Sequence, residues 1–455
     1  MRSLFPDCAT FLLAAKLAHI LRSPAFFIAT FLGFTSVSSA SDLEACSKAK
    51  SDLVLAVCTD AIASGKLSPL DLATAYRYRG NAYRATGDND RAILDYDEAI
   101  RLNPNASAFT NRGRSYDNKG ENGRALQDYT AAIALDPNFD SAFTNRGIIH
   151  RKQGNYDLAI QDYNEAIRLD SKIAVKFYNR ALAYSAKGDK DLAIKDYSEA
   201  IQLDPKYAFA LNNRGTVYLD QGDYDLAIRD FDQAIESGPN YVRAFNNRGT
   251  AYSAKGDYER AIQDYDKAIQ FDPEYAIAYN NRCAAYNRKH DYDSAIQDCS
   301  QAIRLNSSYT RAFDNRATAY REKGDYVRAI EDFDAITRLQ PKNSSGWGDL
   351  CWTRALASQL ELALSDCNEA LRLWPNNVKA LESRAFIHTK LGKFDDAIAG
   401  YDAALELRPK QAFSLYGRGI ARLNKGNTGG GQADVAAAKA IESDIVEKFA
   451  RYGVQ

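Results

Sequence analysis

Small and aromatic residues return along this chain with a period of about 34 residues, at fixed places between charged residues. Counted from the first residue of each copy, place 8 is small, place 20 is Ala in ten of the eleven copies, place 24 is usually aromatic and place 27 is usually Ala. Small residues let two helices approach closely, and aromatic rings fill the space beside them. The pattern therefore predicts two packed helices in each copy.

The copies also contain signals for the ends of these helices. A Gly-Asp pair near the middle of a copy, such as Gly222-Asp223, is typical of the end of one helix and the start of the next. Pro at place 32, as at Pro205 and Pro273, stops the second helix. Eleven copies follow one another from residue 73 to residue 445, the last one degenerate.

This pattern resembles the tetratricopeptide repeat family over residues 73–445. The resemblance implies an all-α fold, an α-solenoid in which antiparallel helix pairs stack into a right-handed superhelix. It also implies that the first helix of each copy lines a concave surface. Copies eight and nine depart from the pattern, because Ala335 comes one place early and Arg354 stands where most copies carry Tyr. Stacking is expected to be less regular there.

Residues 1–40 differ from the copies. Basic residues precede an apolar run at 24–37, and small residues end at Ala40. This order is typical of a signal peptide cleaved after Ala40, and an uncleaved N-terminal anchor is the alternative. The apolar run is short for a bilayer, so we expect no integral membrane span in the mature chain.

The predicted domain organisation follows from these boundaries. Residues 1–40 form the signal peptide, and 41–72 form N-terminal capping helices in a shortened, repeat-like hairpin. Residues 73–445 hold the eleven repeats, and 446–455 form a C-terminal capping helix and tail. A solenoid needs such caps because its end copies would otherwise expose their apolar faces.

Composition narrows the function. The formal net charge is −1 over 455 residues, so no excess of basic charge favours nucleic-acid binding. Only four His occur, and no set of acid, base and nucleophile recurs between copies. We therefore predict no catalytic residues, no metal site and no cofactor, and we expect a protein or peptide partner.

Six of the seven cysteines lie beyond the predicted signal peptide and fall into pairs. Two pairs occupy places 8 and 24, where other copies carry small and aromatic residues that face one another across the helix pair. The third pair precedes the first copy. We predict three disulfides, Cys46–Cys58, Cys283–Cys299 and Cys351–Cys367. Disulfides are typical of an oxidising compartment, and free core cysteines are the alternative.

Charged residues recur at two further places. Place 7 is Arg and place 23 is Asp, each in ten of eleven copies. We interpret them as ion pairs that repeat along the stack, and the alternative is a row of exposed Arg for anionic ligands. Leu350 replaces the Arg in copy nine and Gly400 replaces the Asp in copy ten, so both pairs are predicted to be broken.

Place 6 is Asn in seven consecutive copies. These residues are Asn111, Asn145, Asn179, Asn213, Asn247, Asn281 and Asn315. The resemblance implies that place 6 faces the concave surface, where an amide can donate to and accept from the backbone of a bound peptide. Copies five to seven add Asn212, Asn246 and Asn280 at place 5. The alternative is that the amides bond neighbouring helices or only solvate the groove.

The leading functional hypothesis is a non-enzymatic exported scaffold, periplasmic or else extracellular, that binds a protein or extended peptide in the concave groove. The second hypothesis is a structural component of a cell-envelope assembly or export complex that uses convex or end surfaces. Replacing Asn213, Asn247 and Asn281 distinguishes the two, because only the first needs the groove.

Overall fold

A computed structural model of the chain describes residues 39–48 and 51–454, which form 25 helices and no strand. The predicted signal peptide lies outside the described residues except for its last two. Within those residues, no helix combines the length and apolar character needed to cross a membrane.

The helices follow the chain without interruption by other elements. They are α1 (Ser39–Lys48), α2 (Ser51–Ala63), α3 (Pro69–Ala85), α4 (Asn89–Leu102), α5 (Ala106–Asn118), α6 (Asn122–Leu135), α7 (Asp140–Lys152), α8 (Tyr156–Leu169), α9 (Ala174–Lys187), α10 (Lys190–Leu203), α11 (Ala208–Gln221), α12 (Tyr224–Ser237), α13 (Val242–Ala254), α14 (Tyr258–Phe271), α15 (Ala276–Arg288), α16 (Tyr292–Leu305), α17 (Thr310–Glu322), α18 (Tyr326–Leu339), α19 (Ser344–Leu356), α20 (Leu360–Leu373), α21 (Val378–Lys390), α22 (Phe394–Leu407), α23 (Ala412–Asn424), α24 (Thr428–Ile441) and α25 (Ile445–Arg451).

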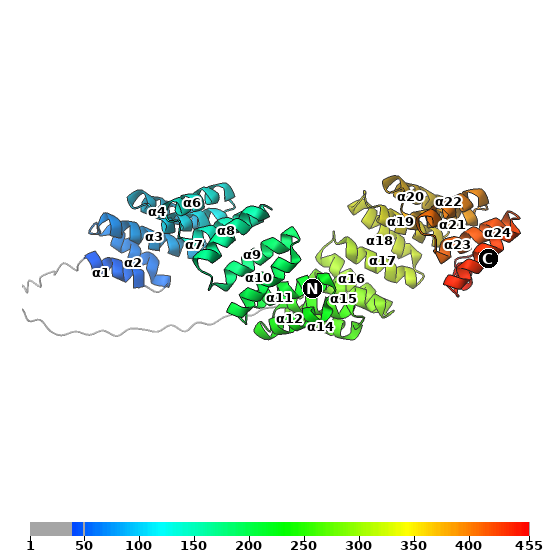
Figure 1. The fold of residues 1–455 in the computed structure, drawn as a ribbon, viewed down its shortest axis with the longest axis horizontal. Helices are drawn as coiled ribbons and strands as arrows, with labels where there is room; N and C mark the ends of the chain where they lie inside the picture. Colours follow the sequence, from blue (N-terminus) through cyan, green and yellow to red (C-terminus); the bar gives the residue numbers. More distant parts are fainter. Residues whose placement is uncertain (1–38, 49–50, 455) are drawn as a thin grey trace, which may run out of the picture. The chain divides into compact units, whose positions relative to one another are not determined.

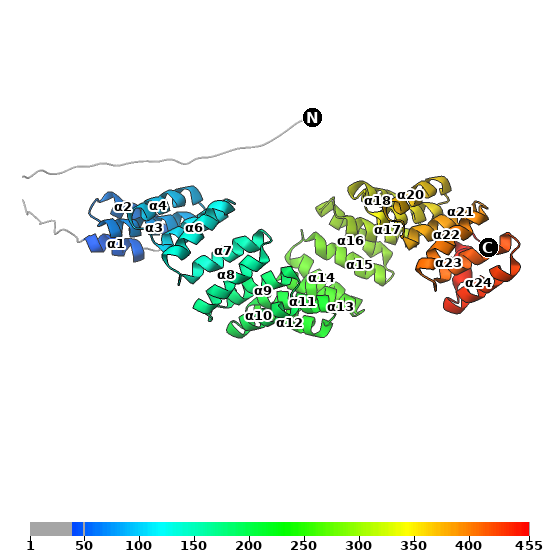
Figure 2. The ribbon, with the colours of Figure 1, turned by 45° about the horizontal axis from the view of Figure 1, so that its top comes forward.

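The chain divides into two compact units between Glu121 and Asn122. Helices α1–α5 belong to the first unit and α6–α25 to the second. Within each unit every helix packs against the next one along the chain, as both views of the ribbon show (Figure 1, Figure 2). The predicted all-α solenoid of stacked helix pairs is confirmed.

The small residue at place 8 lies against the aromatic ring at place 24. In copy six, a Cβ atom built on Gly249 would lie only 2.8 Å from Cε1 of Tyr265, so a larger residue there would require the ring to shift. The turn between the two helices uses a second glycine. In copy six this is Gly256, with a φ of 83°, in the left-handed region that glycine adopts at low cost.

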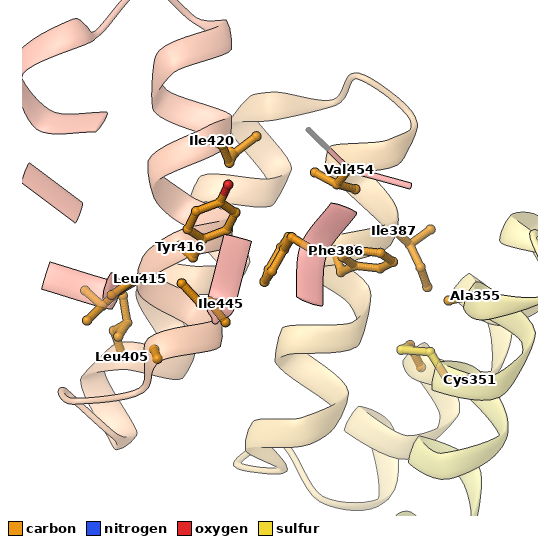
Figure 3. Packing of buried hydrophobic residues seen from close by; sticks show 14 of the residues in the cluster. Cys351, Ala355, Phe386, Ile387, Leu405, Leu415, Tyr416, Ile420, Ile445 and Val454 are labelled. Carbon is orange, nitrogen blue, oxygen red and sulfur yellow. A yellow bond between two sulfur atoms is a disulfide. The ribbon is translucent and has the colours of Figure 1, made fainter. Parts of the chain in front are cut away.

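Apolar residues cover both ends of the described chain. At the N-terminal end, Cys46 and Cys58 of α1 and α2 are buried with Ala75 of α3 in one cluster. At the C-terminal end, Ile445 and Phe449 of α25 are fully buried. Figure 3 shows Ile445 and Val454 beside residues of α21 and α23. Burying such side chains contributes about 1.5–3 kcal/mol each, which explains why the short helix α25 is held on the stack.

Candidate functional site

The arginines at place 7 and the aspartates at place 23 form a repeated ion pair. In copy seven, Arg282 donates from Nε and Nη2 to the two carboxylate oxygens of Asp298, at 2.6 and 2.7 Å. The same two bonds join Arg79 to Asp95, Arg146 to Asp162, Arg180 to Asp196, Arg214 to Asp230, Arg248 to Asp264, Arg316 to Asp332 and Arg418 to Asp434. These aspartates are buried, so the pairs are structural.

The third guanidinium nitrogen links these pairs to the preceding copy. Arg214 donates from Nη1 to Oγ of Ser198 at 2.8 Å, and Arg316 donates in the same way to Ser300 at 2.9 Å. One arginine thus bonds its own second helix and the second helix of its neighbour. The alternative function, a row of exposed Arg for anionic ligands, does not fit side chains that are already bonded on both sides.

Copy nine corrects one prediction. Although Leu350 replaces the place 7 arginine, Arg354 donates from Nη1 to both carboxylate oxygens of Asp366, at 2.9 and 2.7 Å. Its Nη2 also donates to Asp334 of the preceding copy at 3.0 Å. Residues four apart share one face of a helix, so Arg354 reaches the carboxylate that Leu350 does not. The prediction of a broken pair in copy nine was wrong.

In copy ten the carboxylate is missing, as predicted. Arg384 donates from Nη1 to Asn368 at 3.1 Å, and a Cβ atom on Gly400 would meet Ala385 instead of the guanidinium. Burial lowers the pKa of Arg384, and the charge of Asp396 offsets only part of this effect, since no carboxylate is bonded to the guanidinium.

The structure brings the six cysteines together in the three predicted pairs. The Cα–Cα distances are 4.8 Å for Cys46–Cys58, 5.6 Å for Cys283–Cys299 and 5.3 Å for Cys351–Cys367, within the range of disulfides. All six side chains are buried. In copies seven and nine the pair replaces the contact between glycine and an aromatic ring. Figure 3 shows Cys351 at the edge of the C-terminal cluster.

Asparagines of copies five to eight form a continuous series of hydrogen bonds, which we call the amide ladder. Between copies, the place 6 amide donates to the place 5 amide of the preceding copy at 3.0 Å. These bonds are Asn247 to Asn212, Asn281 to Asn246 and Asn315 to Asn280. Within a helix, place 5 donates to place 6, in Asn212 to Asn213, Asn246 to Asn247 and Asn280 to Asn281. Asn213 ends the series by donating to the hydroxyl of Tyr178 at 3.1 Å.

The amide ladder shows that four of the seven predicted asparagines bond a neighbouring copy, which was the alternative interpretation. These bonds leave part of the hydrogen-bonding capacity of the amides unused. Asn281 donates to Asn246 and accepts from Asn280, which leaves it a second N–H and a second lone pair. The place 5 amides are buried, whereas Asn213, Asn247, Asn281 and Asn315 are partly exposed.

The other three predicted asparagines lie in different surroundings. Asn145 donates to the backbone carbonyl of Ser141 in its own helix, at 2.8 Å. Asn179 is buried in α9. Asn111 lies in α5 of the first unit. The seven residues therefore do not act as one uniform set.

Two cavities show which places of the first helices face open space. One, of about 320 Å³, is lined by residues that include Asp349, Trp352 and Lys379. The other, of about 360 Å³, is lined by residues that include Arg311, Asp314 and again Asp349. These residues stand at places 2, 5, 6 and 9 of their copies. We call the side of the first helices that carries these places, in copies four to eleven, the inner face.

Two aspartates stand where the amide ladder would continue. Asp314 is at place 5 of copy eight and Asp349 is at place 6 of copy nine, the two places that exchange a bond in the preceding copies. Partial desolvation beside the cavity raises the pKa of both carboxyls, and the charge of Asp349 raises the pKa of Asp314 further. Sequence reasoning missed this pair, and a comparison of places 5 and 6 across copies was the signal that could have found it.

Aromatic rings form the apolar part of the first cavity. Trp352 packs edge to face against Phe413 and Tyr452, with ring centroids 5.6 and 5.2 Å away. Glu382 lines the same cavity and accepts a bond from Oγ of Ser414 at 2.6 Å. Burial raises the pKa of Glu382. The first cavity, in the last copies, is thus lined by both charged groups and aromatic rings.

Across residues 39–48 and 51–454, no group of three or more His, Cys, Asp and Glu side chains is placed to hold a metal ion.

Solved structures with similar folds cover parts of this chain. MamA is 27% identical over 38% of this chain and 93% of its own, with a TM-score of 0.35. YrrB, described as a TPR protein with an unusual peptide-binding site, is 26% identical over 40% of this chain and 95% of its own, with a TM-score of 0.35. A tetratricopeptide repeat protein from Parabacteroides merdae is 23% identical over 55% of this chain and 98% of its own, with a TM-score of 0.45. No curated protein matches the sequence.

Family models match most of the repeat region. One tetratricopeptide repeat model matches residues 178–242, 212–276, 315–378 and 385–440. A second tetratricopeptide repeat model matches residues 141–172 and 276–309, and a third matches residues 73–106. A TPR repeat model matches 113–154. These matches agree with the constant period of the sequence and with the stacked helix pairs, and the chain belongs to the tetratricopeptide repeat family.

Proposed function

We propose that this protein is a non-enzymatic scaffold that binds a partner protein, through an extended segment, along the inner face of its second unit. The fold is one typical of protein–protein interaction. The observation that carries the finer proposal is the amide ladder. Its amides are held in fixed orientations by one another and still have N–H groups and lone pairs left for a peptide backbone.

Pre-orientation favours such binding. A side chain that must be ordered on binding costs about 0.5–1.5 kcal/mol, and the bonded amides avoid most of this cost. Apolar residues stand beside the ladder at place 2. Phe209 is 55% exposed and Ile277 is 44% exposed, so both can contact the side chains of a bound segment.

The proposal includes export to an oxidising compartment, the periplasm or the cell exterior. The three cysteine pairs at disulfide distance support it, together with the signal-peptide pattern of the sequence. We expect native protein, trapped with an alkylating agent in its own compartment, to be modified at these six cysteines only after reduction. Modification of all six without reductant would contradict export.

A second candidate function is a structural component of a cell-envelope assembly or export complex. It is favoured by exposed leucines at place 19 of three successive copies, on their second helices. Leu158, Leu192 and Leu226 are 48%, 45% and 38% exposed. Regularly spaced apolar residues on this side could contact a partner without using the inner face.

Site-directed photo-crosslinking separates the two candidates. A benzoylphenylalanine residue at position 277 reports on the inner face, and the same residue at position 226 is the matched control on a second helix. We expect cross-links to a partner from position 277 and none from position 226, with mass spectrometry mapping them to one continuous partner segment. Cross-links from position 226 alone would favour the assembly function.

A further inference from the structure

Apolar and cationic side chains alternate at place 2 of the first helices, and they belong neither to the buried core nor to the amide ladder. In copies five to eight it is Phe209, Arg243, Ile277 and Arg311. Both apolar residues and both arginines are exposed. Arg243 forms no ion pair with any other residue of the described chain. Apolar and cationic side chains thus alternate from copy to copy beside the amides.

Arg243 acts electrostatically on three tyrosines of its own and the preceding copies. Its positive charge offsets part of the rise that burial causes in the pKa of Tyr178, Tyr241 and Tyr275. The ring of Tyr241 packs edge to face against Phe209, with centroids 5.3 Å apart. The amide ladder passes through the same copies. Because Arg243 is exposed and forms no ion pair within the described residues, it is open to an anionic partner.

Arg311 differs from Arg243 in this respect. It lines a cavity together with Asp314 and Asp349, so carboxylates of the chain itself already lie in its surroundings. Copy six is therefore the copy whose place 2 arginine most needs an anion from a partner. The copies on either side of it carry Phe209 and Ile277 at the same place.

The hydrogen bonds of the amide ladder join successive first helices directly, so these helices are packed neighbours. Their spacing determines which residues of a bound extended strand each copy can contact. Packed helices lie about 8–10 Å apart, and alternate side chains on one face of an extended chain recur about every 7 Å. One copy therefore corresponds to about two residues of an extended peptide. Successive copies would contact residues i, i+2 and i+4 of the strand.

We propose that the inner face of copies five to seven binds an acidic extended segment, in which one carboxylate pairs with Arg243. Apolar side chains two residues before and two residues after that carboxylate pack against Phe209 and Ile277. This inference rests on the proposed function and adds the chemistry of the partner to it.

The test uses the full chain and three acetylated, amidated peptides. The first peptide is SLSESLSESLS, and the other two carry Gln or Lys in place of both Glu residues. A charge-assisted bond is stronger than a neutral one, so we expect the Glu peptide to bind at least about tenfold more tightly than the Gln peptide. The Lys peptide is expected to bind most weakly. Fluorescence anisotropy measures all three.

Two variants locate the preference. Arg243→Gln should remove the difference between the Glu and Gln peptides and leave the affinity for the Gln peptide unchanged. Arg229→Gln is the matched control, because Arg229 is an exposed arginine on the second helix α12, and it should leave every affinity unchanged. Arg243→Glu should reverse the order, so that the Lys peptide binds more tightly than the Glu peptide.

The outcomes distinguish this inference from the proposed function. Equal binding of the Glu and Gln peptides to the unmodified chain would overturn the acidic preference alone. A preference that persists in Arg243→Gln would overturn the role of Arg243. Failure of all three peptides to bind would overturn the extended-peptide groove, and this inference with it.

Discussion

In copies five to eight the inner face consists of amides that bond from one first helix to the next, whereas copies nine to eleven place carboxylates, a lysine and aromatic rings there. Both regions have the same helix pairs, and the contact between the place 7 arginine and the place 23 aspartate recurs behind copies five to eight and behind copy eleven. The difference lies in self-complementarity. An amide can donate to a copy of itself, but a carboxylate without its proton cannot.

This comparison explains why the ladder stops where it does. Asp314 and Asp349 occupy the next two places, and two charged carboxylates repel one another instead of bonding. Replacing the amide by a carboxylate at these two places ends the continuous network beside a charged cavity. The repeat supplies the position, and the residue at that position determines the chemistry.

The largest predicted effect tests the contacts that the two regions share. Arg282→Ala leaves Asp298 buried without its partner and should lower the free energy of unfolding by about 3–5 kcal/mol. Arg384→Ala in copy ten removes an arginine that is bonded to Asn368 and to no aspartate, and it should cost only about 1 kcal/mol. Urea unfolding followed by circular dichroism measures both. Equal losses would show that the ion pair is not the source of the stability.

The second prediction concerns the bridges of copies seven and nine. Each closes a loop between residues 16 apart, so reduction should cost about 3 kcal/mol per bridge. A double variant, Cys283→Gly with Cys299→Tyr, restores the residue pair of copy six. In that variant the drop in unfolding free energy caused by reductant should be smaller by the contribution of one bridge. An unchanged drop would mean that Cys283–Cys299 contributes nothing.

The third prediction tests the amide ladder itself. Asn246→Ala removes a buried amide that donates to Asn247 and accepts from Asn281, and it should cost about 1–3 kcal/mol of unfolding free energy. Ser383→Ala is the control at place 6 of copy ten, where the hydroxyl bonds only its own helix at the carbonyl of Lys379. It should cost less than about 1 kcal/mol. Similar costs at both positions would argue against a cooperative ladder.

The smallest predicted effect is a gain. Asp349→Asn places an amide opposite Asp314 and should extend the ladder, raising the free energy of unfolding at pH 7 by about 1 kcal/mol. The pKa of the Asp349 carboxyl is raised in the folded chain, so folding favours its protonated form. The stability of the unmodified chain should therefore increase as the pH falls through that raised pKa toward the unfolded value, about 3.9.

The advantage of the Asp349→Asn variant should accordingly be largest at pH 7 and shrink toward pH 4. Thermal unfolding of the two proteins over this range measures it. An advantage that stays constant with pH would show that the charge of Asp349 plays no part.

Much of this structure could be predicted from the sequence because the same residue types recur at the same places of each copy. Gly249 and Tyr265 occupy places that face one another across the helix pair, so the pairing of Cys283 with Cys299 followed from their places. The period also located the ion pairs. These features depend on contacts within one copy, which the repeated sequence specifies directly.

Features that depend on two copies were harder to predict. Arg354 replaces the missing arginine from four residues further along its helix, and it also reaches Asp334 of the preceding copy. The ladder requires that place 6 of one copy lie beside place 5 of the previous one, and a period alone does not say so. The division into two units after Glu121 has no counterpart in the pattern either.

The third bond of the place 7 arginines has a mechanical consequence. Because Arg214 or Arg316 holds side chains of two copies at once, tension applied along the second unit would load neighbouring copies together. The resistance should be least at copy ten, where Arg384 bonds Asn368 without a carboxylate of its own copy. Stretching the protein from its ends would therefore begin to open the stack at that copy.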